Sequence, residues 1–200
     1  MWFDERHLRR HRPVVTEDML GVALPHAGTA HCGHVLSHTL RFQPRVVPSK
    51  FVLLYLPAQR TPDADSEAPT WLAPQHRHHE VVVPLLAILH LWPSTAKASW
   101  TFYDVSREAP RGMTGQFVVV SSDWSHFRRF SAVRHAEDAA ASALTHGSFI
   151  RPDIVDSLPA FRFGTLPHTS WQWVGRSRSG GLRGVGYLSF LLRRDPVSLR

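Results

Sequence analysis

The sequence is short of cysteine and of long apolar runs, and each shortage excludes a class of protein. A single cysteine in 200 residues, Cys32, cannot form an internal disulfide, which excludes a disulfide-stapled secreted fold and a zinc ribbon. The longest apolar runs, 51–56, 81–91 and 185–192, fall short of the ~18 residues that a membrane span needs. We therefore expect an intracellular protein, in the cytoplasm or the mitochondrion, with no membrane contact.

Lysine and acidic residues are scarce beside arginine and histidine. Only Lys50 and Lys97 among 23 basic residues are lysines, 14 histidines stand beside 16 acidic residues, and the net charge is +7. A chain of this charge suits contact with nucleic acid or another anionic surface. GC-rich coding sequence also produces a surplus of arginine, alanine, histidine and proline, so composition alone leaves both explanations open.

The order of the apolar segments predicts the fold class. With 43% hydrophobic residues, the chain is long enough for one compact domain with its own core. Strand-like runs alternate with helical patterns, in the order strand 19–24, helix 33–42, strand 51–56, helix 80–91, strands 100–105 and 117–121, and helix 131–144. This alternation predicts a single α/β domain with a mainly parallel central sheet flanked by helices. Segments 170–174 and 184–192 predict a C-terminal antiparallel hairpin.

We expect three regions along the chain. Residues 1–18, which carry the run MWFDERHLRRHR, are predicted to form a solvated basic arm, residues 19–192 the α/β domain, and residues 193–200 a basic tail. Inside the domain, residues 58–75 are rich in proline and acidic side chains, a composition typical of a long surface loop.

Polar residues follow two of the predicted parallel strands directly. His26 comes after the strand 19–24, and the predicted loop 121–126 carries Asp123 and His126. The carboxyl ends of parallel strands meet at one edge of a sheet, where an imidazole and a carboxylate can bind a metal ion or move a proton. A structural loop histidine and a helix-capping aspartate are the alternatives at these positions.

Four short motifs occur in an order that resembles one known family. They are Pro25-His26-Ala27-Gly28, Glu80 placed four residues before Pro84, the run Val119–His126 (VVSSDWSH) and Val185-Gly186-Tyr187. In this order they are similar to the Memo family over about residues 19–192. That family is related in fold to the catalytic subunit of class III extradiol ring-cleaving dioxygenases, which use non-haem iron(II).

The resemblance implies a metal pocket of which this chain keeps only part. The family's pocket histidine falls on His26, and its later Asp and His fall on Asp123 and His126, whereas Gln59 stands about where a ligand histidine belongs. Glu80 is kept in the helix motif, but Arg77 stands at that motif's histidine position. The pocket position at the start of the first helix is Cys32, which is either a reactive thiol or a buried inert one. A late Cys-Gly-x-x-Pro motif is replaced by 163–167 (FGTLP).

An incomplete donor set predicts a pseudoenzyme without a cofactor, acting as a structural or interaction subunit with protein partners in a larger assembly such as a ribonucleoprotein. One alternative is an oxidoreductase with iron or copper at a rearranged site of His26, Asp123 and His126, to which a nearby histidine contributes. Another is metal-independent hydrolysis, with Ser122 or Ser125 as the nucleophile.

The end of the chain concentrates arginine next to aromatic residues. The residues expected to contact RNA or another anionic partner are Arg176, Arg178, Arg183, Arg193 and Arg194, interleaved with Trp171, Trp173, Tyr187 and Phe190. Arginine on phosphates with aromatic rings for base stacking is typical of non-specific nucleic-acid binding. A charged sheet edge that opposes aggregation is the alternative explanation.

Overall fold

The computed structural model describes residues 1–57, 66–148, 154–180 and 183–195, with the backbone alone at 126–132 and 183. The strands are β1 (Val14–Thr16), β2 (Met19–Leu24), β3 (Phe42–Pro44), β4 (Lys50–Tyr55), β5 (Ser99–Asp104), β6 (Phe117–Ser121), β7 (Trp124–Arg129), β8 (Thr169–Arg178) and β9 (Arg183–Arg194). The helices are α1 (Thr29–Leu40), α2 (His79–Leu91), α3 (Phe130–Thr145) and α4 (Leu158–Gly164). Short 3-10 turns lie at Glu5–His7, Pro74–His76 and Pro93–Lys97.

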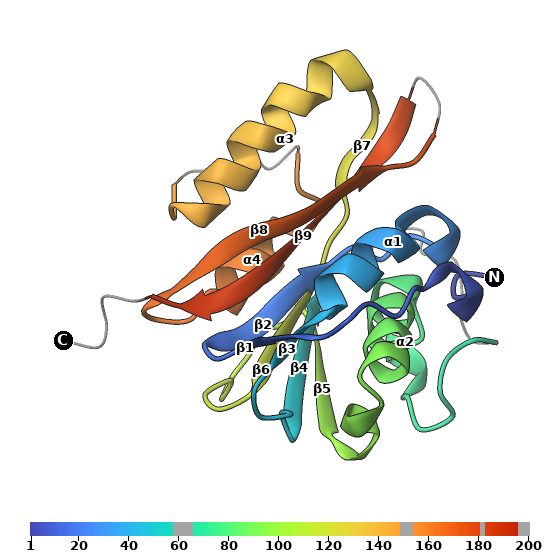
Figure 1. Cartoon of the computed structure of the whole chain (residues 1–200), viewed down its shortest axis with the longest axis vertical. Coiled ribbons are helices and arrows are strands. Elements are labelled where there is room, and N and C mark those ends of the chain that lie inside the picture. The colour runs from blue at the N-terminus through green and yellow to red at the C-terminus, as the bar shows by residue number, and fades with distance from the viewer. Residues whose placement is uncertain (58–65, 149–153, 181–182, 196–200) are drawn as a thin grey trace.

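A mixed sheet forms the centre of the molecule (Figure 1). Strands β5, β4, β6 and β2 pair in that order and are parallel to one another. The long strand β9 continues the sheet antiparallel to β2, and it pairs antiparallel with β7 and β8 as well. The predicted α/β domain with a mainly parallel sheet and a C-terminal antiparallel hairpin is confirmed. Among the described residues, no helix is long and apolar enough to cross a membrane.

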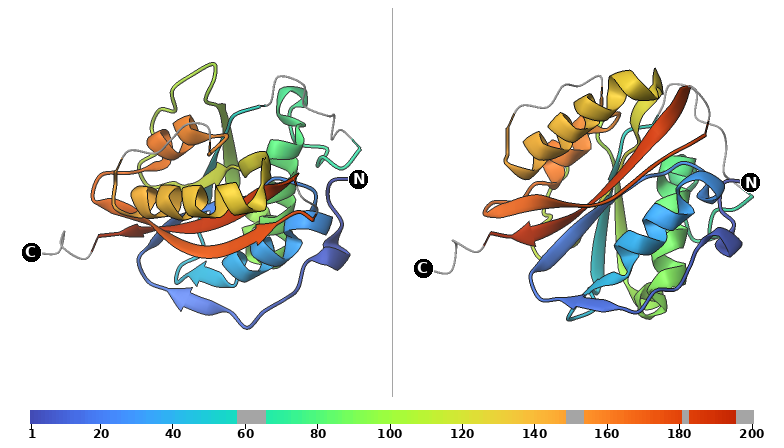
Figure 2. Two further views of the ribbon diagram at one scale, coloured as in Figure 1. Left: turned by 90° about the horizontal axis from the view of Figure 1, so that it is seen from above. Right: turned by 45° about the horizontal axis from the view of Figure 1, so that its top comes forward.

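The alternation of side chains along each strand builds a separate apolar core on each face of the sheet. Phe51, Leu53 and Tyr55 of β4 pack with α1 and α2, whereas Val52 and Leu54 pack with α3 and α4. Figure 2 shows the two helix pairs on opposite sides of the sheet. These strands read as continuous apolar runs because both of their faces are covered.

The N-terminal arm docks on the domain at a few points, which the prediction did not include, although most of its side chains are exposed as predicted. Leu8 is 8% exposed and belongs to the core on the α1 side, and β1 pairs in parallel with β3. The backbone passes so close to α1 that a Cβ on Gly33 would lie 2.6 Å from the carbonyl oxygen of His7. The charges of the arm hid this contact in the sequence, since its docking depends on a few apolar residues and one helix glycine.

The polar segment after β6 is also shorter than predicted. Only Ser122 and Asp123 connect the strands, because β7 begins at Trp124 and places the backbone of His126 within a strand. Trp124 is fully buried and stacks on Phe190 of β9, with ring centroids 5.5 Å apart. The burial of this tryptophan draws residues that look like loop in the sequence into the sheet.

Gly21 provides a test of the close packing of β2 against β6. A Cβ at this position would lie 2.4 Å from the backbone carbonyl oxygen of Val118, which cannot move aside as a flexible side chain could. We expect Gly21→Ala to lower the free energy of unfolding by about 2 kcal/mol or more, measured by urea denaturation. Gly180→Ala is the matched control, since nothing lies within 4 Å of its Cβ position. If both variants lost the same free energy of unfolding, the destabilisation would not come from the close packing of β2 against β6.

Candidate functional site

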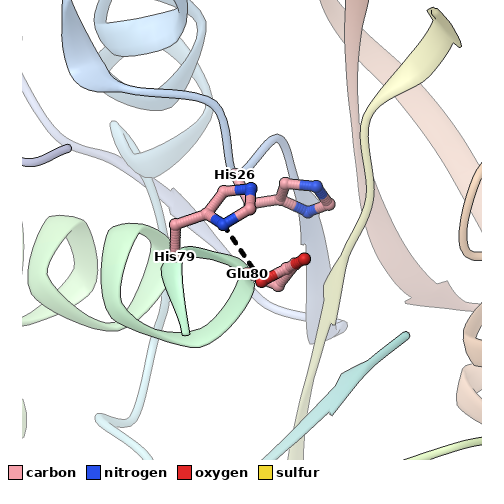
Figure 3. Close-up of side chains that lie close together, drawn as sticks. All are labelled: His26, His79 and Glu80. Carbon is pink, nitrogen blue, oxygen red and sulfur yellow. Dashed lines mark ion pairs between the residues drawn. The ribbon is translucent and has the colours of Figure 1, made fainter. Parts of the chain in front are cut away.

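A buried polar cluster lies where the carboxyl ends of β2 and β6 meet the first turn of α2. His26 follows β2, Ser121 ends β6, and His79 and Glu80 open α2. His26 and Glu80 are 3% and 1% exposed, and Ser121 is fully buried. Figure 3 shows the imidazoles of His26 and His79 and the carboxylate of Glu80 gathered at one point.

Pro84 determines how this cluster is held together. Proline has no N–H, so the carbonyl of Glu80, four residues earlier in α2, receives no helical hydrogen bond from it. The hydroxyl of Ser121 donates to that carbonyl instead. Since this uses the only hydroxyl hydrogen, the 3.0 Å contact between His26 Nδ1 and Ser121 Oγ requires Nδ1 to carry the proton. In neutral His26, the Nε2 lone pair then points away from Ser121.

Three donor groups converge in the cluster. One ligand atom each from His26, His79 and Glu80 lies within 4.8 Å of the other two, and His79 Nδ1 lies 3.2 Å from Glu80 Oε2. Burial, with a smaller contribution from His26, lowers the pKa of His79 to about 4 although Glu80 opposes the shift. The imidazole of His79 is therefore neutral at pH 7, and its buried Nδ1 has no hydrogen-bond partner among the described residues.

Two aspartates also lie close to His26. Asp123 Oδ1 accepts a hydrogen bond of 2.9 Å from the backbone N–H of His26, which fixes the segment that follows β2. Asp156 Oδ2 lies 3.4 Å from His26 Nε2, and Ser122 Oγ donates to Asp156 at 2.7 Å. Asp156 follows an unremarkable run of sequence, and no sequence signal pointed to it. The tertiary fold alone adds this carboxylate to the cluster.

The donor types fit a divalent transition metal. Two imidazoles and one carboxylate are a set that proteins use for non-haem iron(II) and for zinc. A ligating imidazole is neutral, and His79 meets this condition at pH 7 because its pKa is lowered to about 4. His26, His79 and Glu80 would hold such an ion.

The N-terminal arm covers this cluster. The indole of Trp2 stacks on His79 with ring centroids 4.3 Å apart. Glu67 holds the arm by accepting hydrogen bonds from the backbone N–H groups of Trp2 and Phe3 at 2.6 Å each, and Asp4 N–H donates to Thr29 Oγ1 at 2.8 Å. Hollows of about 260 to 670 Å³ elsewhere on the protein are lined by other residues.

Only some of the predicted site residues belong to the cluster. It brings His26, Asp123 and Glu80 together, whereas Gln59 and the side chain of His126 lie outside the described residues. Cys32 is fully buried, donates to the Ala27 carbonyl, and has a pKa raised well above its usual value by burial, so its thiol is inert. Arg77, at the family's histidine position, donates to the carbonyl of Leu72 instead.

Among the described side chains, which do not include that of His126, both serines considered as nucleophiles are engaged with other carboxylates. Ser122 donates to Asp156, and buried Ser125 donates to Glu137 and accepts from Arg178 at 3.3 Å. Ser125 also adopts a left-handed backbone conformation, with φ of 44°. Its side chain is committed to a structural network that joins β7 to α3 and β8.

The sequence offers the run 76–80 either as a chelating cluster or as a solvated cluster before a helix, and it does not single out His79. Within this run, His76 is engaged elsewhere, since its Nδ1 lies 3.0 Å from the Tyr55 hydroxyl. Only the start of α2 at His79 decides which histidine faces the cluster. The motif of Glu80 and Pro84 indicated a helix here but not the residue at which it begins.

The arginines of the C-terminal hairpin are largely engaged within the chain. Arg176 contacts Asp138 at 2.5 Å, Arg178 contacts Glu137 at 3.4 Å, and Arg193 contacts Asp18 at 2.8 Å. Arg194 is exposed, and the side chain of Arg183 lies outside the described residues. The ion pairs reduce the charge that this hairpin offers to a partner.

Comparison with known proteins adds no relative. A scan against protein-family models finds no match to the chain, and a search of curated proteins finds none either. The Memo resemblance therefore stays a prediction, and the site is interpreted from its own geometry.

The lowered pKa of His79 predicts acid sensitivity of the fold. The unfolded chain takes up a proton near pH 6.5 and the folded chain only near pH 4, so stability is lost as pH falls through this window. We expect the free energy of unfolding to drop by about 2 kcal/mol between pH 7 and pH 5, measured by urea denaturation. His79→Phe keeps an aromatic ring against Trp2 and should remove this part of the dependence of the free energy of unfolding on pH. If the intact protein and the variant showed the same dependence on pH, His79 would not be its cause.

Proposed function

We propose that this chain is a non-catalytic Memo-like domain that works as an interaction subunit, with a divalent metal ion held structurally at His26, His79 and Glu80. The observation that carries the proposal is the cover over the cluster. Of the three donors, His26 and Glu80 are almost fully buried, and the side chain of His79 is 12% exposed. Trp2 stacks on this imidazole and covers it. A catalytic metal site keeps an open position and a path for substrate, whereas a structural site is closed by protein.

The cover is built into the fold. Thr29 N–H donates to the carbonyl of Trp2 at 2.9 Å, which ties the arm to the first turn of α1. A Cβ on Gly28 would lie 3.4 Å from the same carbonyl oxygen, so the arm lies in van der Waals contact with the segment after His26. Opening the site would break these contacts and the hydrogen bonds to Glu67 together.

The cluster has a role in stability whether or not it holds an ion. Asp123 fixes the backbone of His26, and Ser121 links β6 to α2 through the carbonyl of Glu80. A bound ion would add Lewis acidity at this point. The Glu80 carboxylate would offset part of its charge, the two imidazoles would supply lone pairs, and this arrangement would join β2 to α2.

A second candidate function is a metal-dependent oxidoreductase. The combination of two imidazoles and one carboxylate favours it, because the same donor types serve iron(II) in oxygenases. The two candidates differ in whether a small anion can reach the ion. That difference is measurable without knowing any substrate.

Cobalt(II), whose absorption reports its coordination, tests the proposed site. We expect one equivalent of Co²⁺ to bind, and His79→Ala to weaken binding by at least about a hundredfold because a ligand is lost. His78→Ala is the matched control, since His78 precedes the cluster without belonging to it. Equal binding by the His79→Ala protein and the His78→Ala protein would contradict the ligand assignment.

Azide then separates the closed site from an open one. We expect azide to leave the Co²⁺ spectrum of the intact protein unchanged and to alter that of Trp2→Gly, in which the cover over His79 is removed. A spectrum of the intact protein that changes with azide would overturn the structural assignment and favour the oxidoreductase.

A further inference from the structure

The strand β5 lies at one edge of the central sheet (Figure 1). Among the described strands it pairs only with β4. Ser99 N–H donates to the carbonyl of Ser49 at 2.9 Å, and the parallel register with β4 repeats this direction at every second residue. The backbone N–H and C=O groups of Trp100 and Phe102 therefore face away from β4. In the described part of the chain they have no hydrogen-bond partner.

The edge of β5 is not protected by charge. Residues 99–103 read SWTFY, and Asp104 at the end of the strand is 8% exposed. The strand β8, which pairs with β9, carries Arg176 and Arg178 in contrast. Charged side chains on an edge strand oppose the pairing of a further strand. Since β5 has none before its last residue, its edge can accept one.

An aromatic surface adjoins this edge. Trp100 and Phe102 lie on the α2 face of β5 and stack with ring centroids 6.1 Å apart. Trp71, which is 55% exposed, has its ring centroid 6.4 Å from that of Phe102. Directly opposite residues of paired strands project from the same face of a sheet. The side chain opposite Phe102 on an added strand would therefore lie on the face that Trp71 shares.

Both lysines of the chain lie at the amino end of β5. Lys97 comes just before the strand, and Lys50 is in register with Ser99. Both are exposed, and among the described residues neither contacts a carboxylate within 4.0 Å. At the carboxyl end of β5, Arg107 is paired with Asp104 at 3.0 Å. The charge of the edge therefore favours a ligand that brings an acidic residue to the amino end of β5.

A second copy of this chain fits the edge less well than a different segment does. Antiparallel pairing of two β5 strands about Phe102 would bring Lys97 of one copy near Arg107 of the other, and the two-fold symmetry would repeat the contact. Like charges at opposite positions destabilise a strand pair. The charges therefore favour a partner of other sequence.

We propose that the edge of β5 binds an extended segment of a partner protein as an added antiparallel strand. The backbone groups of Trp100 and Phe102 would pair with the segment, and its alternate apolar side chains would pack against Phe102 and Trp71. Antiparallel pairing, which is slightly more stable per residue than parallel pairing, puts the carboxyl end of the segment at the amino end of β5. An acidic residue there would meet Lys50 and Lys97. The inference deepens the interaction role proposed above and rests on it, and it does not depend on the metal cluster.

A fluorescein-labelled eight-residue peptide of alternating valine and threonine, ending in two aspartates, tests the edge by fluorescence anisotropy. We expect the intact protein to bind it, and Phe102→Pro to bind it about tenfold or more weakly than Phe102→Ala does. Both variants lack the ring, but only proline lacks the N–H that faces the partner, and β4 does not use this N–H. Equal binding by the two variants, or no binding by the intact protein, would overturn the proposal.

Methylated peptides test the same pairing on the intact protein, without any variant that must fold. Methyl groups on the backbone nitrogens of one alternate set of residues should abolish binding, and the same groups on the other set should leave it nearly unchanged, because only one set faces β5. Equal effects of the two sets would contradict strand pairing.

Side chains at the edge then test the partner's chemistry. We expect Trp71→Ala to weaken peptide binding about tenfold, whereas Trp173→Ala, which removes an exposed tryptophan from β8, should leave it unchanged. We expect Lys50→Gln with Lys97→Gln to weaken binding about fivefold, and Arg134→Gln with Arg162→Gln, at exposed positions away from β5, to have no effect. Equal weakening within either pair of variants would contradict the assigned surface.

Sedimentation velocity separates a partner segment from a second copy. We expect the intact protein to sediment as a monomer, and a dimer that Phe102→Pro dissociates would overturn the assignment to a partner. Failure of the peptide to bind together with an azide-insensitive cobalt site would refute this inference and leave the closed site intact. Azide access would refute the closed site and leave the edge of β5 intact.

Discussion

The hydrogen bond from Ser121 to the carbonyl of Glu80 organises the candidate site. It exists because Pro84 leaves that carbonyl without its helical donor, and it connects the end of β6 to the first turn of α2. By using the hydroxyl hydrogen, it also sets the proton of His26 on Nδ1. One missing N–H in a helix thus determines which imidazole nitrogen can accept a proton or a metal ion. The position of Glu80 and His79 depends on the same turn.

The N-terminal arm has two effects on the molecule. Its first residues cover the polar cluster, because Trp2 stacks on His79, and its next residues line two surface hollows beside α1. Both depend on close approach to α1, which Gly28 and Gly33 permit. A segment of high charge therefore behaves as part of the domain, closing an internal site while presenting arginine at the surface.

Charge counts in the sequence do not locate the charge that a partner meets. The hairpin holds the densest arginine in the chain, yet Arg176, Arg178 and Arg193 pair with acids from α3 and from the turn before β2. The arm holds fewer arginines, but those at 9 and 10 lack such partners among the described residues. Ion pairs between distant segments decide the difference, since each removes one cation from the accessible surface.

The sequence by itself predicted the main strands and three of the helices, because apolar runs are local patterns, and it placed His26 and Asp123 near one sheet edge, whereas Glu80 joined them only through the family resemblance. It did not show β7, the docking of the arm or the contribution of Asp156, which depend on burial and pairing between distant segments. Only the tertiary structure decided that His79 joins His26, since a shift of one residue in the start of α2 turns a side chain by about 100°. The closure of the site and the position of β5 at one edge of the sheet follow from long-range contacts of the same kind.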